Sequence, residues 1–144
     1  MNQASFQATT DAAALSARTL MAAIFLVSAA GKVADPAGTI GYIASVGLPV
    51  PALAYGVALL AELLGGLLLT LGWRTRWAAI ALAGFSVTSA LLFHNAVGDQ
   101  NQLFHFLKNL AMAGGLLQLA AFGPGRLSLD AKANRQSPAA SVAV

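Results

Sequence analysis

The sequence contains no cysteine and very little charge. Without cysteine the chain cannot form a disulfide, a thiolate-ligated zinc or iron–sulfur centre, or a cysteine nucleophile. Only 9% of the 144 residues are charged, whereas a soluble domain carries about 25%. The chain is 58% hydrophobic and its mean hydropathy is +0.72. Because so few charges cannot cover a globule of this size in water, the composition predicts one compact domain embedded in a membrane.

Several classes of function have no support in the sequence. The net charge of +3 comes from eight Lys and Arg scattered along the chain, which make no basic patch, so we expect no nucleic-acid partner. There is no glycine-rich dinucleotide motif, P-loop, nucleophile elbow or zinc-protease helix motif. The sequence therefore predicts neither a nucleotide site nor a dedicated metal site.

Four apolar runs are long enough to cross a bilayer as helices. About 20 apolar residues span the roughly 30 Å hydrocarbon core, and none of the runs shows the alternation typical of strands. The runs cover residues 12–33, 51–73, 77–97 and 103–122. We therefore predict an all-α, integral membrane four-helix bundle within residues 1–126, with residues 127–144 as a disordered cytoplasmic tail.

The loop charges predict the orientation of this bundle. Five Lys and Arg fall in the second loop and the C-terminal tail, namely Arg74, Arg76, Arg126, Lys132 and Arg135. By the positive-inside rule we expect a multi-pass protein of the bacterial inner membrane with both termini in the cytoplasm. Alternatively, the first run is a signal peptide cleaved near Val27-Ser28-Ala29. The presence of Asp11, and of no Lys or Arg before the run, favours a spanning helix.

Two charged residues lie deep within the predicted spans. Glu62 precedes Gly65-Gly66 in the second span, and Lys108 precedes a similar pair, Gly114-Gly115, in the fourth. If the two glycine pairs lie at the same depth, the rise of 1.5 Å per residue places Lys108 about 4.5 Å further outward than Glu62. A buried carboxylate needs a partner, so we predict a Glu62–Lys108 ion pair. The pair serves either chemistry or only helix register.

Further polar residues gather in the outward half of the predicted bundle. His105 shares a helical face with Lys108, His94 ends the third span, and Lys32 ends the first. Together they predict a cup above Glu62 whose groups can exchange protons with a quinone–quinol couple. Each also has a simpler explanation: the histidines as interfacial residues, haem ligands or, with Glu62, metal ligands, and Lys32 as an interface anchor.

The ordered motifs of the chain resemble the DoxX family of small bacterial inner-membrane proteins. The similar segments, between Arg18 and Leu119, are Ser28-Ala29-Ala30-Gly31-Lys32, Gly47-Leu48-Pro49, Glu62-Leu63-Leu64-Gly65-Gly66-Leu67-Leu68-Leu69, Thr75-Arg76, Lys108-Asn109-Leu110 and Gly114-Gly115-Leu116-Leu117. The resemblance implies a four-helix membrane bundle, with some relatives being subunits of thiosulfate:quinone oxidoreductases and others linked to quinone, catechol or thiol stress. The matching polar residues are Arg18, Lys32, Glu62, Lys108 and Asn109, with a weaker match at His94 and His105.

We therefore expect a redox-associated protein that binds a quinone-like or small aromatic molecule near Glu62 and Lys108. The candidate ligand-binding residues are Glu62, Lys108, His105, His94, Lys32, Asn109 and Arg18. A quinone is a cofactor that such a site could hold, and two histidines on adjacent helices could hold a haem instead, but the sequence requires neither. The alternative functions are a proton-coupled carrier of a small solute and a non-catalytic membrane subunit of an oxidoreductase. The sequence leaves open whether the chain is itself a quinone-linked oxidoreductase. It also leaves open whether the chain's partner is an oxidoreductase subunit or a second copy of the chain.

Overall fold

The computed structural model describes residues 2–136, which form six helices and no strand. The helices are α1 (Gln3–Ala34), α2 (Pro36–Ser45), α3 (Pro51–Leu71), α4 (Thr75–Phe93), α5 (Gln100–Phe122) and α6 (Leu129–Gln136). The predicted all-α fold is therefore confirmed, and its four long helices α1, α3, α4 and α5 correspond to the four apolar runs.

Local sequence signals set most helix boundaries. The break between α1 and α2 is the pair Asp35-Pro36, where the Asp35 carboxylate accepts a hydrogen bond from Gly38 N and proline occupies the first turn of α2. Asp99 caps α5 in the same way, accepting from Gln102 N. Helix α3 ends at Gly72, whose φ of 65° is the left-handed conformation that glycine adopts without strain.

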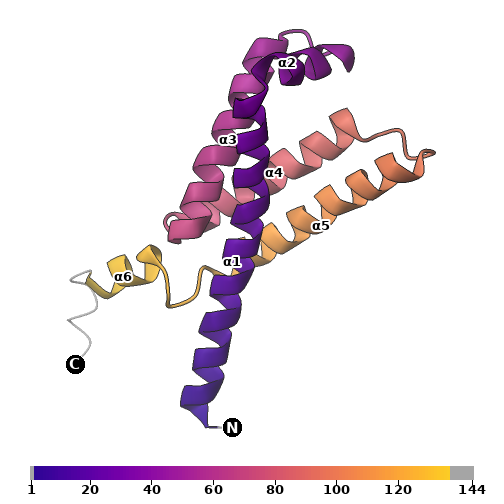
Figure 1. Ribbon diagram of the computed structural model, residues 1–144. Helices are drawn as coiled ribbons and strands as arrows, with labels where there is room; N and C mark the ends of the chain where they lie inside the picture. The colour runs from indigo at the N-terminus through magenta and orange to yellow at the C-terminus, as the bar shows by residue number, and fades with distance from the viewer. Residues whose placement is uncertain (1, 137–144) are drawn as a thin grey trace.

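The long helices form two pairs that diverge towards one end. Helix α1 packs mainly along α3, and α4 along α5, while α3 and α4 join the pairs. Figure 1 shows the pairs spreading apart towards the end where α2 lies, with α6 near the opposite end. We refer to these as the α2 end and the α6 end.

Small residues allow the helices to approach closely, both within the α1–α3 pair and between the two pairs. A Cβ atom on Gly65 would lie 2.7 Å from Leu82 Cγ of α4, and one on Gly66 would lie 2.8 Å from Leu26 of α1. In α5, Gly115 packs against Met21 of α1. Three of the four glycines in the repeated Gly-Gly pairs thus serve helix packing, as small residues do in membrane proteins.

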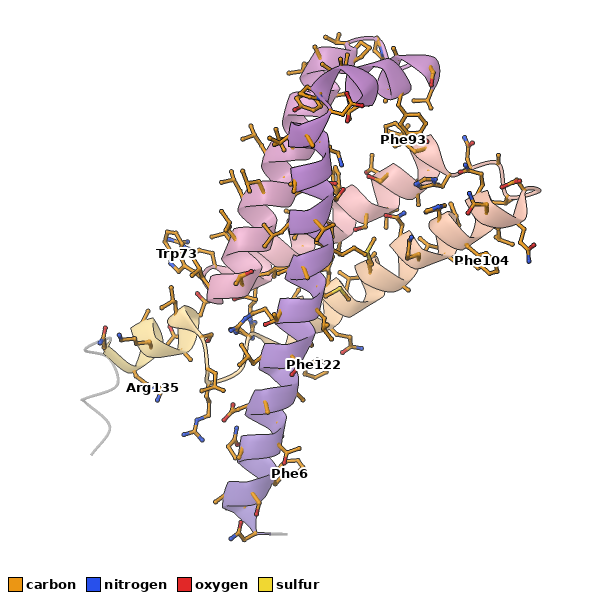
Figure 2. The ribbon with its side chains drawn as sticks, in the orientation of Figure 1. Phe6, Trp73, Phe93, Phe104, Phe122 and Arg135 are labelled. Carbon is orange, nitrogen blue, oxygen red and sulfur yellow. The ribbon has the colours of Figure 1, made fainter. Side chains whose placement is uncertain are left out.

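Of the helices in residues 2–136, α1, α3 and α4 are long and apolar enough to span a membrane. Helix α5 has 23 residues but contains polar side chains, including Lys108, Asn109 and Gln118, so its insertion depends on its neighbours. Large apolar side chains are exposed on all four long helices, among them Leu20, Leu53, Trp77 and Phe122. Figure 2 labels two of them on α5, Phe104 and Phe122. This apolar exterior fits contact with a lipid bilayer.

The structure also differs from the sequence predictions. Helix α1 begins at Gln3 rather than near residue 12, and α2 occupies a segment expected to be a loop. Residues 129–136, expected in a disordered tail, form α6, because its Asp130 is held by the α3–α4 turn. The rest of that tail, residues 137–144, lies outside the described residues.

Candidate functional site

A cavity of about 800 Å³ lies between the two helix pairs at the α2 end, within the size range of small-molecule sites. Aromatic and aliphatic side chains cover much of its wall, including Phe25, Phe85 and Phe93, and α2 contributes Thr39, Tyr42 and Ile43. The polar residues on the wall include Ser28, Lys32, Asp35, Glu62, Thr88, Ser89, His94, Lys108 and Asn109. The site is therefore mostly apolar, with polar groups at defined points.

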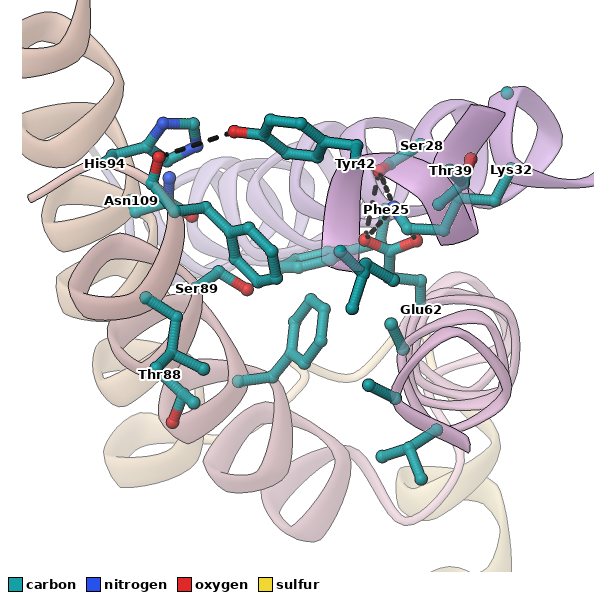
Figure 3. A pocket seen from close by; sticks show the side chains of 18 of the residues that line it. Phe25, Ser28, Lys32, Thr39, Tyr42, Glu62, Thr88, Ser89, His94 and Asn109 are labelled. Carbon is teal, nitrogen blue, oxygen red and sulfur yellow. Dashed lines mark hydrogen bonds and ion pairs between the residues drawn. The ribbon is translucent and has the colours of Figure 1, made fainter. Parts of the chain in front are cut away.

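The central polar feature is a triad of Glu62, Lys32 and Ser28 (Figure 3). Lys32 Nζ lies 2.9 Å from both carboxylate oxygens of Glu62 and donates a hydrogen bond to Oε1 and another to Ser28 Oγ. Ser28 Oγ donates to Glu62 Oε1 at 3.0 Å. The Glu62 side chain is only 5% exposed and that of Lys32 19%. Burial without a counter-charge would be costly, and Lys32 supplies that charge.

The predicted Glu62–Lys108 ion pair is wrong. Among residues 2–136, Glu62 pairs with Lys32 of α1, and Lys108 lines the cavity without an ion-pair partner. The reason is helix adjacency: α3 lies along α1, whereas α5 lies along α4. Helices α3 and α5 are not direct neighbours, so Glu62 and Lys108 do not meet even if they lie at similar depths.

Helix α2 partly covers the outer end of the cavity through Tyr42. The Tyr42 ring stacks on Phe93 at the end of α4, with centroids 5.7 Å apart, and its hydroxyl lies 3.5 Å from the Phe93 carbonyl oxygen (Figure 3). This contact connects the first helix pair, through α2, to the second. This part of the wall is therefore built from a segment that was predicted to be a loop and is a helix.

The two histidines stack on each other beside this part of the wall. Their ring centroids are 4.9 Å apart, and His94 Nδ1 is 2.9 Å from Gln102 Oε1. His94 and Asn109 line the cavity, whereas His105 does not. In residues 2–136 no group of three or more His, Cys, Asp or Glu could hold a metal ion, so the alternative of a metal bound by both histidines and Glu62 is not realised.

Arg18 lies away from the cavity, towards the α6 end. It is 2% exposed and donates 2.8 Å hydrogen bonds to the carbonyl oxygens of Pro124 and Leu127. These bonds fix the segment between α5 and α6. Arg18 is thus neither a cavity residue nor a surface anchor; it is a buried structural residue.

Comparison with known families assigns the chain. A family model described as DoxX matches residues 13–95, which include most of α1, all of α2, α3 and α4, and the Glu62–Lys32 pair. This chain belongs to the DoxX family. The DoxX chain is 37% identical over 126 residues to "Inner membrane protein YqjF" of Escherichia coli (strain K12), covering 88% of this chain and 95% of that relative. It is 35% identical over 123 residues to "Inner membrane protein YphA" of the same organism, covering 81% and 86%. No solved structure matches the DoxX chain.

The structure of this DoxX protein adds two residues that the sequence did not identify as site residues, Ser28 and Tyr42. Ser28 stands four positions before Lys32, so the two share a helical face, and that spacing was the available signal. Nothing in the sequence indicated that Tyr42 lines the cavity, because its place there depends on where α2 packs.

The turn that follows Gly72 in the DoxX chain is closed by Asp130 of α6. Its carboxylate accepts hydrogen bonds from the backbone N–H groups of Arg74 (2.7 Å) and Thr75 (2.9 Å), where α4 begins without a cap of its own. Burial disfavours the charged form of Asp130, but these hydrogen bonds outweigh that effect, so its pKa is below the usual value. Asp130 therefore acts as an N-cap supplied from a distant segment.

Proposed function

We propose that this protein binds a quinone-like or small aromatic molecule in the cavity between its helix pairs, within a bacterial inner membrane. Both relatives are named inner membrane proteins. The basic residues Arg74, Arg76, Arg126 and Arg135 belong to the α6 end of the chain, which supports a cytoplasmic position for that end. The cavity then opens in the half of the membrane that faces the periplasm.

One observation carries the proposal: one oxygen of the buried Glu62 carboxylate has a counter-charge but no hydrogen-bond donor. Oε2 lies 2.9 Å from Lys32 Nζ in the ion pair, but Nζ donates its hydrogen bond to Oε1, and Oε2 accepts none from any of residues 2–136. A buried acceptor without a donor costs free energy, and Glu62 is on the wall of the cavity. A phenol, catechol or quinol hydroxyl would supply the missing donor.

The rest of the wall suits the remainder of such a molecule. Phe25, Phe85 and Phe93 provide faces against which an aromatic ring can pack. His94 and Asn109 stand on the helix pair opposite Glu62, and their side chains can bond a second ring oxygen. Lys32 holds charge beside Glu62 and so favours a proton-donating ligand at that carboxylate.

The proposal concerns binding, and a redox reaction would need a source of electrons outside this cysteine-free chain. An oxidoreductase subunit that exchanges electrons with the bound quinone is the partner that this role implies. A second copy of the chain is the other assembly to consider.

Binding is tested with the purified protein in nanodiscs and a short-chain ubiquinol or menaquinol analogue, measured by thermal shift and equilibrium titration. Glu62→Gln should weaken binding of the quinol about tenfold or more, the value of one hydrogen bond to a charged group. Lys132→Gln on α6, far from the cavity, should leave affinity unchanged. Absence of saturable binding to the unaltered protein would contradict the proposal.

The buried carboxylate also fits a proton-coupled carrier, since such carriers use an acidic residue in the membrane. In proteoliposomes, proton-driven solute uptake that Glu62→Gln abolishes would support that function instead. A tightly associated partner subunit, with neither ligand nor uptake, would indicate a non-catalytic membrane subunit.

A further inference from the structure

The gap between α1 and α5 bears on how a ligand reaches the cavity. Helices α1 and α5 meet where Gly115 packs against Met21, and their contact is much less extensive than that within either helix pair. Towards the α2 end the two helices separate (Figure 1). The cavity begins beyond this crossing.

Residues on both sides of the gap line the cavity and are also exposed on the outside of the bundle. On α1, Ile24 is 39% exposed, and Gly31 has no side-chain or distant backbone atom within 4 Å of where its Cβ would be. On α5, Lys108 is exposed and Met112 is half-buried, and both line the cavity. The wall is therefore incomplete between α1 and α5. Exposed apolar side chains, such as Val27 of α1 and Leu107 of α5, stand near this gap on the outside of the bundle.

The α2 end of the cavity is partly covered. Thr39, Tyr42 and Ile43 of α2 line it, with Ile43 only 4% exposed and Tyr42, 49% exposed, stacked on Phe93. An approach through α2 has to pass this stack, whereas an approach from the side passes between α1 and α5, whose contact is much less extensive than that within either helix pair.

We propose that the gap between α1 and α5 is a lateral entrance through which a lipophilic molecule dissolved in the bilayer passes into the cavity. This inference rests on the proposed function and specifies its ligand class as one that partitions into hydrocarbon. The ammonium group of Lys108, which has no ion-pair partner among residues 2–136, stands beside the entrance. It attracts the oxygen-bearing ring of an amphiphile, while an apolar tail extends into the lipid.

The entrance is tested by quenching of a single tryptophan by brominated acyl chains. The background variant carries Trp73→Phe and Trp77→Phe, which removes both native tryptophans. Met112→Trp then reports from the entrance, and Leu20→Trp, at a position 73% exposed on α1, is the lipid-facing reference. Each variant is reconstituted in phosphatidylcholine with or without brominated chains. If Met112→Trp does not fold, Ile24→Trp reports from the other side of the gap.

We expect Met112→Trp to lose a fraction of its fluorescence comparable with that lost by Leu20→Trp. Decyl-ubiquinol should then bring the ratio of tryptophan fluorescence between brominated and unbrominated vesicles closer to one at Met112→Trp, and leave it unchanged at Leu20→Trp. Negligible quenching at Met112→Trp, with full quenching at Leu20→Trp, would overturn the lateral entrance. Quenching that the quinol does not relieve would retain the entrance and count against quinol binding instead.

Discussion

Replacing Lys32 with methionine removes the counter-charge of Glu62 and keeps the length of the side chain. The Lys32 Nζ lies 2.9 Å from both carboxylate oxygens. At an effective dielectric constant of about 20, two unit charges at this separation attract each other by about 6 kcal/mol before the cost of desolvation. Removing one partner of a buried pair typically costs about 3–5 kcal/mol. Because the Lys32 side chain keeps 19% of its exposure, we expect a loss near the lower end, about 3 kcal/mol.

This loss is measured as the free energy of unfolding in mixed micelles, with SDS as denaturant and far-UV circular dichroism as the signal. The double variant Lys32→Met with Glu62→Gln should recover most of the loss, because no charge is then left buried. The resulting coupling energy between the two positions should be about 1–3 kcal/mol.

Lys108→Met is the matched control, because this lysine also lines the cavity and has no ion-pair partner among residues 2–136. It should change the free energy of unfolding by about 0.5 kcal/mol or less. The reasoning is refuted if Lys108→Met is as destabilising as Lys32→Met, or if Glu62→Gln fails to rescue the Lys32→Met variant.

Three further predictions concern the packing of the bundle and its α6 end. Arg18→Met should lower the free energy of unfolding by about 3 kcal/mol, since it removes the hydrogen bonds that the guanidinium donates to two carbonyl groups. Because these bonds hold the segment between α5 and α6, trypsin should then cleave faster after Arg126; an unchanged cleavage rate would argue against that structural role. Asp130→Ala should cost about 1 kcal/mol at pH 7. Because the pKa of Asp130 is lowered in the folded state, this side chain stabilises the fold above its unfolded pKa, and the stabilisation declines as the pH falls below about 4. The free energies of unfolding of the unaltered protein and of Asp130→Ala should therefore converge between pH 7 and pH 3. Gly65→Ala should cost about 1–3 kcal/mol, since its Cβ would lie 2.7 Å from Leu82 Cγ. A Cβ on Gly114 would meet no atom within 4 Å, so Gly114→Ala should be neutral or stabilising by up to about 1 kcal/mol. Equal effects of the two glycine substitutions on SDS unfolding would contradict a packing role for Gly65.

The long helices were predictable because hydrophobic length is a local property of the sequence. The runs at residues 51–73 and 77–97 became α3 and α4 with ends shifted by a few residues. Glu62 could also be identified as a site residue from the sequence, since a carboxylate within an apolar span needs a special reason.

The partner of Glu62 was not predictable in the same way, because it depends on which helices become neighbours. The chain leads from α3 through α4 to α5, yet α3 packs along α1, so Lys32 reaches the carboxylate and Lys108 does not. The ordered α6 depends on long-range contacts too, since Asp130 bonds backbone groups of residues more than 50 positions away. Asp35-Pro36 was interpreted only as the end of the first span, although the same pair begins α2.

The proposed function requires that the cavity beside Glu62 holds a quinone-like or small aromatic molecule. The most direct measurement is mass spectrometry of the lipophilic molecules that remain bound to the protein purified in native lipid nanodiscs, compared between the unaltered chain, Glu62→Gln and Lys132→Gln. We expect a quinone or phenolic compound with the unaltered chain and with Lys132→Gln, and its loss with Glu62→Gln. An equal content of such a compound in all three samples, or its absence from all three, would contradict the claim.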